Sequence, residues 1–460
     1  MKSSNREAAL SKNEMVHLDI TGMTTDGNGV GRCRNMAVFV PNTAIGDHAC
    51  VRIIKTAKTY AIGKLLSLPR PSPDRMEADC PHFLQCGGCA FRHIRYPAEL
   101  QIKEQRVRDA LSRIGGLDAF PVQPIVGAQE TDHYRNKAQL PISRGTDGEL
   151  KLGFYAYHSH RVVPCEQCPL QPAVFDRAMQ VFRDWERDFP QEVYDEATGR
   201  GCLRHLYLRE ARATGEVMVC VVANADALNG EDALAERLRD AIPGLQSVIL
   251  NTNRERTNVI LGKDCRTIWG ESMITDVLCG LRFEISPLSF YQVNHDQTQR
   301  LYDLVKEYAG LTGAETVLDL YCGTGTIGLT LASAAKALIG VEVIPEAVEN
   351  ARKNAALNGI TNAQFLCADA AKAAGELRQS GQLPDVVVLD PPRKGCAPGL
   401  VDTIREMAPQ KVVYVSCDPA TLARDLRLFA DAGYGPVALT PVDLFPRTAH
   451  VECVTCLVKK

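Results

Sequence analysis

Apolar residues near the N-terminus alternate with polar ones over short distances. Between residues 14 and 66 the alternating runs, of which Ala37–Val40 and Ala49–Ile54 are two, are separated by glycine turns. Alternation of this kind is typical of half-buried strands joined by tight turns. We therefore expect a small β-barrel over residues 14–75, preceded by a flexible tail at residues 1–13.

The pattern changes after the barrel. Leu68–Pro73 contains three prolines, which lack the backbone N–H of a strand ladder, and this predicts a stiff linker. Apolar residues at helical spacing then predict a helix from about Pro97 to Gly115–Gly116. Residues 120–265 mix strand-like and helix-like segments. We assign residues 76–268 to a central α+β domain.

From about residue 270 apolar β runs alternate with helical stretches. One helix is expected at Pro345–Leu357, because Asn358 and Gly359 are a typical helix end. Strands separated by helices predict a parallel, doubly wound sheet, so residues 269–460 are expected to form an α/β domain. The strand candidates are Thr316–Leu320, Ala337–Glu342, Asp385–Leu389 and Lys411–Val415.

Composition narrows the class of protein. The 460 residues are 45% hydrophobic and 23% charged, and no run approaches the roughly 18 apolar residues of a membrane span. The N-terminus has no apolar signal segment, so we expect a cytoplasmic protein without a membrane partner. The net charge is −3, yet residues 32–75 hold eight basic and two acidic side chains. Such a basic module favours a phosphate-rich partner, although a solvated basic face would look the same.

A glycine-rich loop follows the first strand of the α/β domain. Asp319–Gly328 carries three glycines, which allow a sharp turn and close approach to a ligand, and Glu342 ends the next strand. The alternative is an ordinary strand–helix turn. The loop resembles that of class I S-adenosylmethionine methyltransferases more than that of NAD enzymes. Asp369 stands where those enzymes contact adenine; its alternative role is a helix N-cap.

A cysteine and a glutamate near the C-terminus are candidate catalytic residues. Methylation of uracil at C5 needs a thiolate that adds to C6 and a base that removes the C5 proton. Cys417 ends a β run just before a helix, whose N-terminus would lower the thiol pKa, and Glu452 lies on the last β run. The alternatives are a buried structural cysteine and a surface carboxylate. Cys396, after Asp390–Arg393, is a rival nucleophile.

Seventeen cysteines are many for a reducing compartment. Cys80, Cys86 and Cys89 are closely spaced, and either Cys165 or Cys168 would complete a set of four thiolates. Four thiolates suit zinc or an iron–sulfur cluster. The asymmetric spacing favours a [4Fe–4S] cluster with a structural role.

Together these residues resemble bacterial 23S rRNA (uracil-5-)-methyltransferases of the RNA 5-methyluridine methyltransferase superfamily, over nearly the whole chain. The resemblance implies a TRAM-like (OB-like) barrel, a central domain with an iron–sulfur cluster, and a C-terminal Rossmann-like class I methyltransferase sheet. It implies Cys417 as the nucleophile and Glu452 as the base. The implied cluster ligands are Cys80, Cys86, Cys89 and Cys168. The implied cofactor-binding residues are Gln292, Tyr321, Thr326, Glu342, Asp369 and Asp390.

The expected activity is S-adenosylmethionine-dependent methylation of a uridine in 23S rRNA by a monomer, with the uridine flipped out of its RNA to reach Cys417. Transfer RNA is the alternative substrate. A non-catalytic RNA-binding or chaperone protein is the alternative from another class. Cys417 and Glu452 argue against it, because binding alone requires neither.

Overall fold

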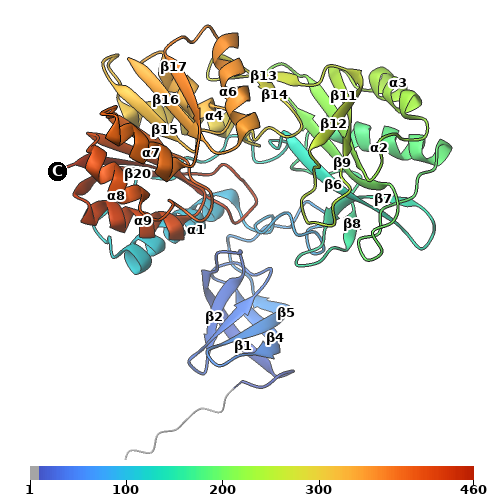
Figure 1. Cartoon of the computed structure of the whole chain (residues 1–460). Helices are drawn as coiled ribbons and strands as arrows, with labels where there is room; N and C mark the ends of the chain where they lie inside the picture. The colour runs from blue at the N-terminus through green and yellow to red at the C-terminus, as the bar shows by residue number, and fades with distance from the viewer. Residues whose placement is uncertain (1–9) are drawn as a thin grey trace, which may run out of the picture. The chain divides into compact units, whose positions relative to one another are not determined.

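The computed structural model describes residues 10–460, and residues 1–9 of the expected tail lie outside this range. The chain divides into two compact units, which are described separately (Figure 1). The first runs to Arg106 and includes Phe445–His450. The second comprises Val107–Leu444 and Val451–Lys460. Among the helices of the described residues, none is long and apolar enough to cross a membrane.

A closed five-stranded barrel begins the first unit. Alternate residues point into its core, where Leu18, Val38 and Val51 are almost fully buried. Leu10, from the expected tail, packs into the same core. The strands are β1 (Met15–Met23), β2 (Gly29–Cys33), β3 (Met36–Val40), β4 (His48–Thr56) and β5 (Tyr60–Arg70).

The prediction of a stiff linker at Leu68–Pro73 is wrong for its first three residues, which belong to strand β5. The strand continues to Arg70, which pairs with His48 of β4. The register shifts between the His48 and Cys50 pairs, so Pro69 falls at an irregularity of the ladder. Proline is tolerated at such a bulge because no ladder N–H is required there.

The predicted helix after the cysteine-rich segment is present as α1 (Tyr96–Ala110), continued by one π-helical turn, Leu111–Gly115. Gly116 ends it in the left-handed conformation, with φ of 61°. Glycine adopts this conformation without the steric cost of a Cβ atom.

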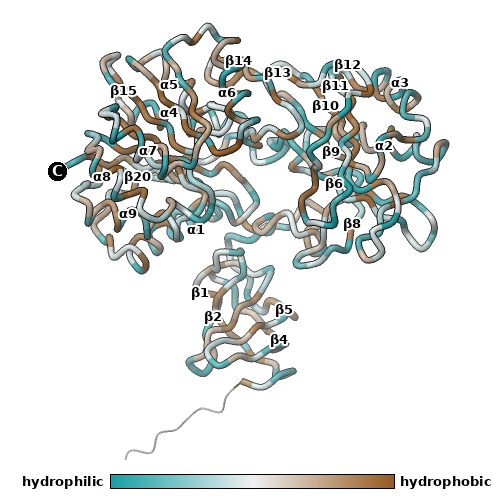
Figure 2. The backbone as a smooth tube through the Cα atoms, in the orientation of Figure 1, coloured by the Kyte–Doolittle hydropathy of each residue, from teal (hydrophilic) through white to brown (hydrophobic). Residues whose placement is uncertain are grey.

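The second unit contains two seven-stranded sheets. The sheet of residues 137–270 has the order β12-β11-β10-β9-β6-β7-β8, and α2 (Ala173–Asp188) and α3 (Glu231–Ala241) pack against it around Phe182 and Leu234. Figure 2 shows hydrophobic positions concentrated along its central strands. The strands are β6 (Lys137–Arg144), β7 (Leu150–Tyr155), β8 (Val162–Pro164), β9 (Leu203–Glu210), β10 (Val217–Ala223), β11 (Leu245–Thr252) and β12 (Asp264–Gly270).

The C-terminal sheet has the order β17-β16-β15-β18-β19-β21-β20. Its first five strands are parallel, as predicted, whereas the last two are antiparallel. Successive residues of a strand point to opposite faces of the sheet. In β15, Val317 packs in one hydrophobic core and Leu318 in the core on the other face. The strands are β15 (Thr316–Leu320), β16 (Ala337–Glu342), β17 (Ala363–Cys367), β18 (Val386–Leu389), β19 (Lys411–Ser416), β20 (Tyr434–Val442) and β21 (Glu452–Lys459).

Three helices cover each face of this sheet, as expected for a doubly wound fold. A hairpin of β13 (Ile274–Leu278) and β14 (Leu281–Ile285) packs with the first group. The helices are α4 (His295–Ala309), α5 (Thr326–Ala332), α6 (Pro345–Leu357), α7 (Ala370–Gln379), α8 (Leu400–Met407) and α9 (Pro419–Asp431).

Candidate functional site

The parallel strands of the C-terminal sheet deliver four of the predicted residues to one edge. Tyr321, Asp390 and Cys417 directly follow β15, β18 and β19, and Glu342 is the last residue of β16. Because these strands are parallel neighbours, their carboxyl ends lie at the same edge. Ligands of open α/β sheets bind at this edge.

Glu452 reaches the same edge because β21 runs antiparallel to β19. The register pairs Ser416 with Cys453, so the first residue of β21 lies beside the end of β19. Glu452 is buried, with 4% of its surface exposed, while Cys417 is half-buried. The structure therefore brings together the two residues that the sequence predicted as a catalytic pair.

The carboxyl groups at this edge hold their protons unusually tightly. Burial, reinforced by the charge of Asp390, raises the pKa of Glu452 to about 8, and Arg393 opposes that rise. Burial also raises the pKa of Asp390 to about 7. A cluster of buried carboxyls favours a cationic ligand, because a positive charge would allow them to ionise.

The thiol of Cys417 contradicts the expectation of a lowered pKa. Burial, with the charges of Glu452 and Asp390, raises its pKa to about 11, and Arg393 only partly offsets this. Helix α9 does begin at Pro419, but the Asp418 carboxylate caps it. The capping carboxylate accepts the bonds of the free N–H groups, so burial and the two acids dominate.

The loop Asp319–Gly328 is held together by its own first residue. The Asp319 carboxylate accepts the Gly328 N–H at 2.9 Å, and a Cβ atom on Gly328 would lie 2.6 Å from that oxygen. Gly323 and Gly325 have positive φ angles, and so does Tyr321 at 67°. Burial, then Asp390, raises the pKa of Asp319 to about 8. The glycines are thus required by the turn and by the close packing of α5.

Two acidic residues expected to contact the cofactor also organise the backbone. Glu342 accepts the N–H groups of Val343, Ile344 and Gly323, which ties the loop to β16. Asp369 caps α7 by accepting the N–H groups of Ala371 and Lys372. The N-cap alternative for Asp369 is therefore confirmed, and its cofactor contact stays a prediction.

Tyr321 and Thr326 lie in the loop after β15 and at the start of α5. The Tyr321 hydroxyl accepts the Ala397 N–H at 3.2 Å. Thr326, the first residue of α5, shares a 2.7 Å hydrogen bond with the buried Tyr302 hydroxyl.

Gln292 lies in the loop that leads into α4. Its carbonyl oxygen accepts the Asn136 side-chain N–H at 2.9 Å, while its side chain is half-buried. The backbone of Gln292 is therefore fixed just before the helix.

Cys396 has a structural environment. Its N–H donates to Asp425 at 2.8 Å, and its sulfur lies 3.7 Å from the Tyr414 hydroxyl, which also donates to Asp425. Burial raises the pKa of Cys396 to about 12. Neither Asp425 nor the charge of Arg393 was anticipated. Asp425 lies within a helix without a motif, whereas the position of Arg393 directly after Asp390–Pro392 was an available signal.

The predicted cluster ligands are distributed over both units. Cys80, Cys86 and Cys89 belong to the first unit and are half-buried, and Cys168 belongs to the second. Within residues 10–460 no group of three or more His, Cys, Asp or Glu side chains is arranged to hold a metal ion. The Gly88 N–H donates to the Cys86 sulfur at 3.3 Å. The [4Fe–4S] cluster thus stays a prediction.

Comparisons with known proteins agree with this architecture. Residues 95–460 match the family described as tRNA (Uracil-5-)-methyltransferase, and residues 11–66 match the TRAM domain. Uncharacterized RNA methyltransferases of Halalkalibacterium halodurans and Clostridium tetani are 44% and 42% identical, over 99% and 98% of this chain and 100% and 97% of their own. The crystal structure of Pyrococcus abyssi tRNA (uracil-54, C5)-methyltransferase with S-adenosyl-L-homocysteine is 28% identical, with a TM-score of 0.78 over 96% of this chain and 100% of that one.

Proposed function

This chain belongs to the tRNA (Uracil-5-)-methyltransferase family of S-adenosylmethionine-dependent RNA methyltransferases, and from that premise we propose that it methylates C5 of a uridine in 23S rRNA. The observation that carries the chemistry is the pairing of β19 with β21, which sets Cys417 beside Glu452. A thiol and a buried carboxyl side by side are what C5 methylation requires.

In the proposed reaction the Cys417 thiolate adds to C6 of the uracil, and the electron pair moves to C5 and O4. S-adenosylmethionine, when bound, would supply a methyl group on a positively charged sulfur; C5 takes the methyl group, the methyl–sulfur bond breaks, and S-adenosyl-L-homocysteine is the leaving group. Glu452 then accepts the C5 proton, the C5–C6 double bond forms again, and the C6–sulfur bond breaks to release Cys417. The half-buried Asp390 and the buried Glu452, whose pKa values are both raised, suit a site that holds a cation.

We assign the cofactor to the loop and the strand ends around it. Glu342 and Asp369 each have a carboxylate at the same edge of the sheet, and Gly323 leaves open space in the loop, because nothing lies within 4 Å of a Cβ atom built on it. The residues proposed to hold S-adenosylmethionine are Gln292, Tyr321, Thr326, Glu342, Asp369 and Asp390.

Transfer RNA is a second candidate substrate. The N-terminal barrel and the cysteine-rich segment favour ribosomal RNA as the substrate, because compact tRNA enzymes of this superfamily often lack both. However, the Pyrococcus abyssi structure that aligns with 96% of this chain is described as a tRNA (uracil-54, C5)-methyltransferase. Incorporation of labelled methyl groups into unmodified 23S rRNA and into unmodified tRNA, measured at equal concentration, distinguishes the two. Methylation of tRNA alone would refute the ribosomal assignment.

The test of the chemistry is tritium release from RNA labelled at uracil C5. We expect release that depends on S-adenosylmethionine and that falls on the order of a thousandfold or more in Cys417→Ala. The same variant should bind the cofactor like the native enzyme. Because elimination needs the base, Glu452→Gln should accumulate a covalent enzyme–RNA adduct. Normal turnover by Glu452→Gln would refute the assignment of the base.

We also propose that Cys80, Cys86, Cys89 and Cys168 hold a [4Fe–4S] cluster with a structural role. The supporting observations are three half-buried thiols within ten residues and the N–H bond to the Cys86 sulfur. Anaerobically prepared protein should contain about four iron and four sulfide ions per chain. Cys86→Ser should lose them, whereas Cys265→Ser, at an exposed cysteine, should not. Native protein without iron would refute the proposal.

A further inference from the structure

Six residues near the C-terminus, Phe445–His450, belong to the first compact unit although the chain on both sides belongs to the second. We call them the strap. The strap is followed in the chain by Val451 and then by Glu452, the proposed base. Contacts that fix the strap therefore fix the backbone only two residues before Glu452.

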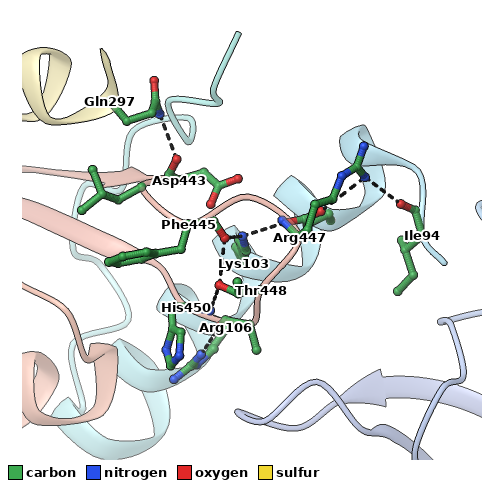
Figure 3. A network of polar contacts seen from close by, with 12 residues as sticks. Ile94, Lys103, Arg106, Gln297, Asp443, Phe445, Arg447, Thr448 and His450 are labelled. Carbon is green, nitrogen blue, oxygen red and sulfur yellow. Dashed lines mark hydrogen bonds and ion pairs between the residues drawn. The ribbon is translucent and has the colours of Figure 1, made fainter. Parts of the chain in front are cut away.

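One face of α1 holds the strap through buried charges. The Glu99 carboxylate accepts hydrogen bonds from the backbone N–H of Arg447 and from the Lys103 ammonium, both at 2.7 Å. The Lys103 ammonium in turn donates to the Phe445 carbonyl oxygen at 3.1 Å. Glu99 and Lys103 are 0% and 1% exposed. Figure 3 shows Lys103 directed at the strap from this helix.

The same strap receives bonds from the rest of its unit. Arg106, one turn after Lys103, donates to the Ala449 carbonyl oxygen at 2.6 Å and to that of Thr25 in the barrel at 3.3 Å. The N–H groups of Ala90 and Phe91 both donate to the Arg447 carbonyl oxygen, at 2.9 and 3.0 Å. The end of the cysteine-rich segment and α1 thus both bind the strap, and Arg106 also joins α1 to the Thr25 loop of the barrel.

The buried charges of Glu99 and Lys103 contribute more to the position of the strap than to the free energy of unfolding. A buried ion pair loses hydration on both partners, and apolar residues of the same size often stabilise a fold equally well. Here each charge also makes a directed bond to the strap backbone, on Arg447 and on Phe445. The Thr448 hydroxyl adds a further bond to Phe445 within the strap, at 2.8 Å. Such directed bonds fix the path of a backbone segment, which apolar contacts do not.

We propose that Glu99, Lys103 and Arg106 are positioning residues, which set the place of the Glu452 carboxylate through the strap. The inference rests on the proposed function, since it assumes that Glu452 is the base. Glu452 acts only after methyl transfer, when it takes the C5 proton and the C6–sulfur bond breaks. A displaced strap therefore slows elimination selectively and leaves RNA attached to Cys417.

The experiment uses full-length protein with Arg106→Ala and Lys103→Gln. Arg106→Ala leaves the buried pair of Glu99 and Lys103 intact, so this variant carries the test if Lys103→Gln does not fold. Arg113→Ala is the matched control, because Arg113 lies just after α1, is 76% exposed and forms a surface ion pair with Asp109. The readouts are methyl transfer in a single turnover, multiple turnover, and covalent adduct on a denaturing gel.

We expect turnover by both strap variants to fall roughly tenfold to a hundredfold, as for small displacements of a catalytic group. Single-turnover methyl transfer should change less than about twofold, within the range of surface substitutions, and adduct should accumulate. Native turnover, or equal loss of methyl transfer and elimination, would overturn the inference. Glu452→Gln is the reference: if it traps no adduct, the proposed function fails, whereas trapping by Glu452→Gln alone overturns only the role of the strap.

Discussion

At the scale of single residues, the candidate site is marked by three acidic groups that burial keeps protonated to an unusually high pH. Glu452 and Asp390 both have pKa values raised by burial, to about 8 and about 7, and Cys417 is raised to about 11. Such shifts are costly for a folded protein and are common where chemistry occurs. They also make both the activity and the stability of this enzyme depend on pH.

The first prediction concerns the rate. Glu452 must be ionised to accept the C5 proton, and a pKa near 8 leaves most of it protonated at neutral pH. Because Glu452 acts after methyl transfer, its ionisation affects kcat rather than kcat/KM. We therefore expect kcat for RNA methylation, measured at saturating RNA, to rise with pH between about 6 and 9. A pH series with saturating S-adenosylmethionine measures this. A rate independent of pH over that interval would contradict the role of Glu452.

The second prediction concerns stability. The pKa of Glu452 is raised from 4.5 to about 8, so between these values the native state binds more protons than the unfolded chain. The free energy of unfolding must then fall as the pH rises through this interval. Glutamine does not titrate, so Glu452→Gln should raise Tm over the native protein more at pH 9 than at pH 5. Equal differences in Tm at the two pH values would refute the buried, protonated state.

At the scale of elements, the strand–loop–helix unit of Asp319–Gly328 and the last two strands position the site. The sequence predicted the strands Thr316–Leu320 and Ala337–Glu342 and the helix Pro345–Leu357 with the bounds they have in the structure. The two strands are short apolar runs, and the helix is followed by Asn358 and Gly359, so local signals suffice. The sequences of β20 and β21 do not show that these strands run antiparallel, because alternation of apolar and polar residues is the same in either direction of a strand.

The close packing of Gly328 against Asp319 predicts the effect of a larger residue in the loop Asp319–Gly328. In Gly328→Ala the new methyl group would lie 2.6 Å from the Asp319 carboxylate, so that carboxylate or α5 must shift. We expect a loss of roughly 1–3 kcal/mol in the free energy of unfolding, as for overpacked sites, and weaker binding of S-adenosylmethionine. Gly375→Ala in α7 is the control, because nothing lies within 4 Å of its added methyl. Calorimetry of both variants measures these effects, and a Gly328→Ala variant as stable as Gly375→Ala would contradict them.

At the scale of the whole molecule, we expect the basic barrel to supply affinity for RNA apart from the proposed catalytic residues. Arg52 and Lys64 are exposed and face each other across β4 and β5. Such pairs bind phosphates without reading sequence. The protein carries a net charge of −3, so its contact with RNA has to be local.

The fourth prediction follows from that local charge. Replacing Arg52 and Lys64 together by alanine should raise KM for RNA several-fold, leave kcat within about twofold, and reduce the salt slope of binding by about two. Lys372→Ala, at an exposed site of α7, should change none of these. Titrations from 50 to 300 mM salt, as for other phosphate-binding proteins, measure the slope. An unchanged slope would place the RNA elsewhere.

The sequence by itself predicted the N-terminal barrel, several elements of the C-terminal domain, the loop of glycines and the candidates Cys417 and Glu452, because periodicity, turn residues and reactive side chains are local properties of a chain. Only the tertiary structure decided the raised pKa of Cys417, the role of Asp369 as a helix cap and the course of β5 through Pro69. Burial, neighbouring charge and strand register arise from residues far apart in sequence. The strap has the same origin, since Glu99 and Arg447 meet across 348 positions of the chain.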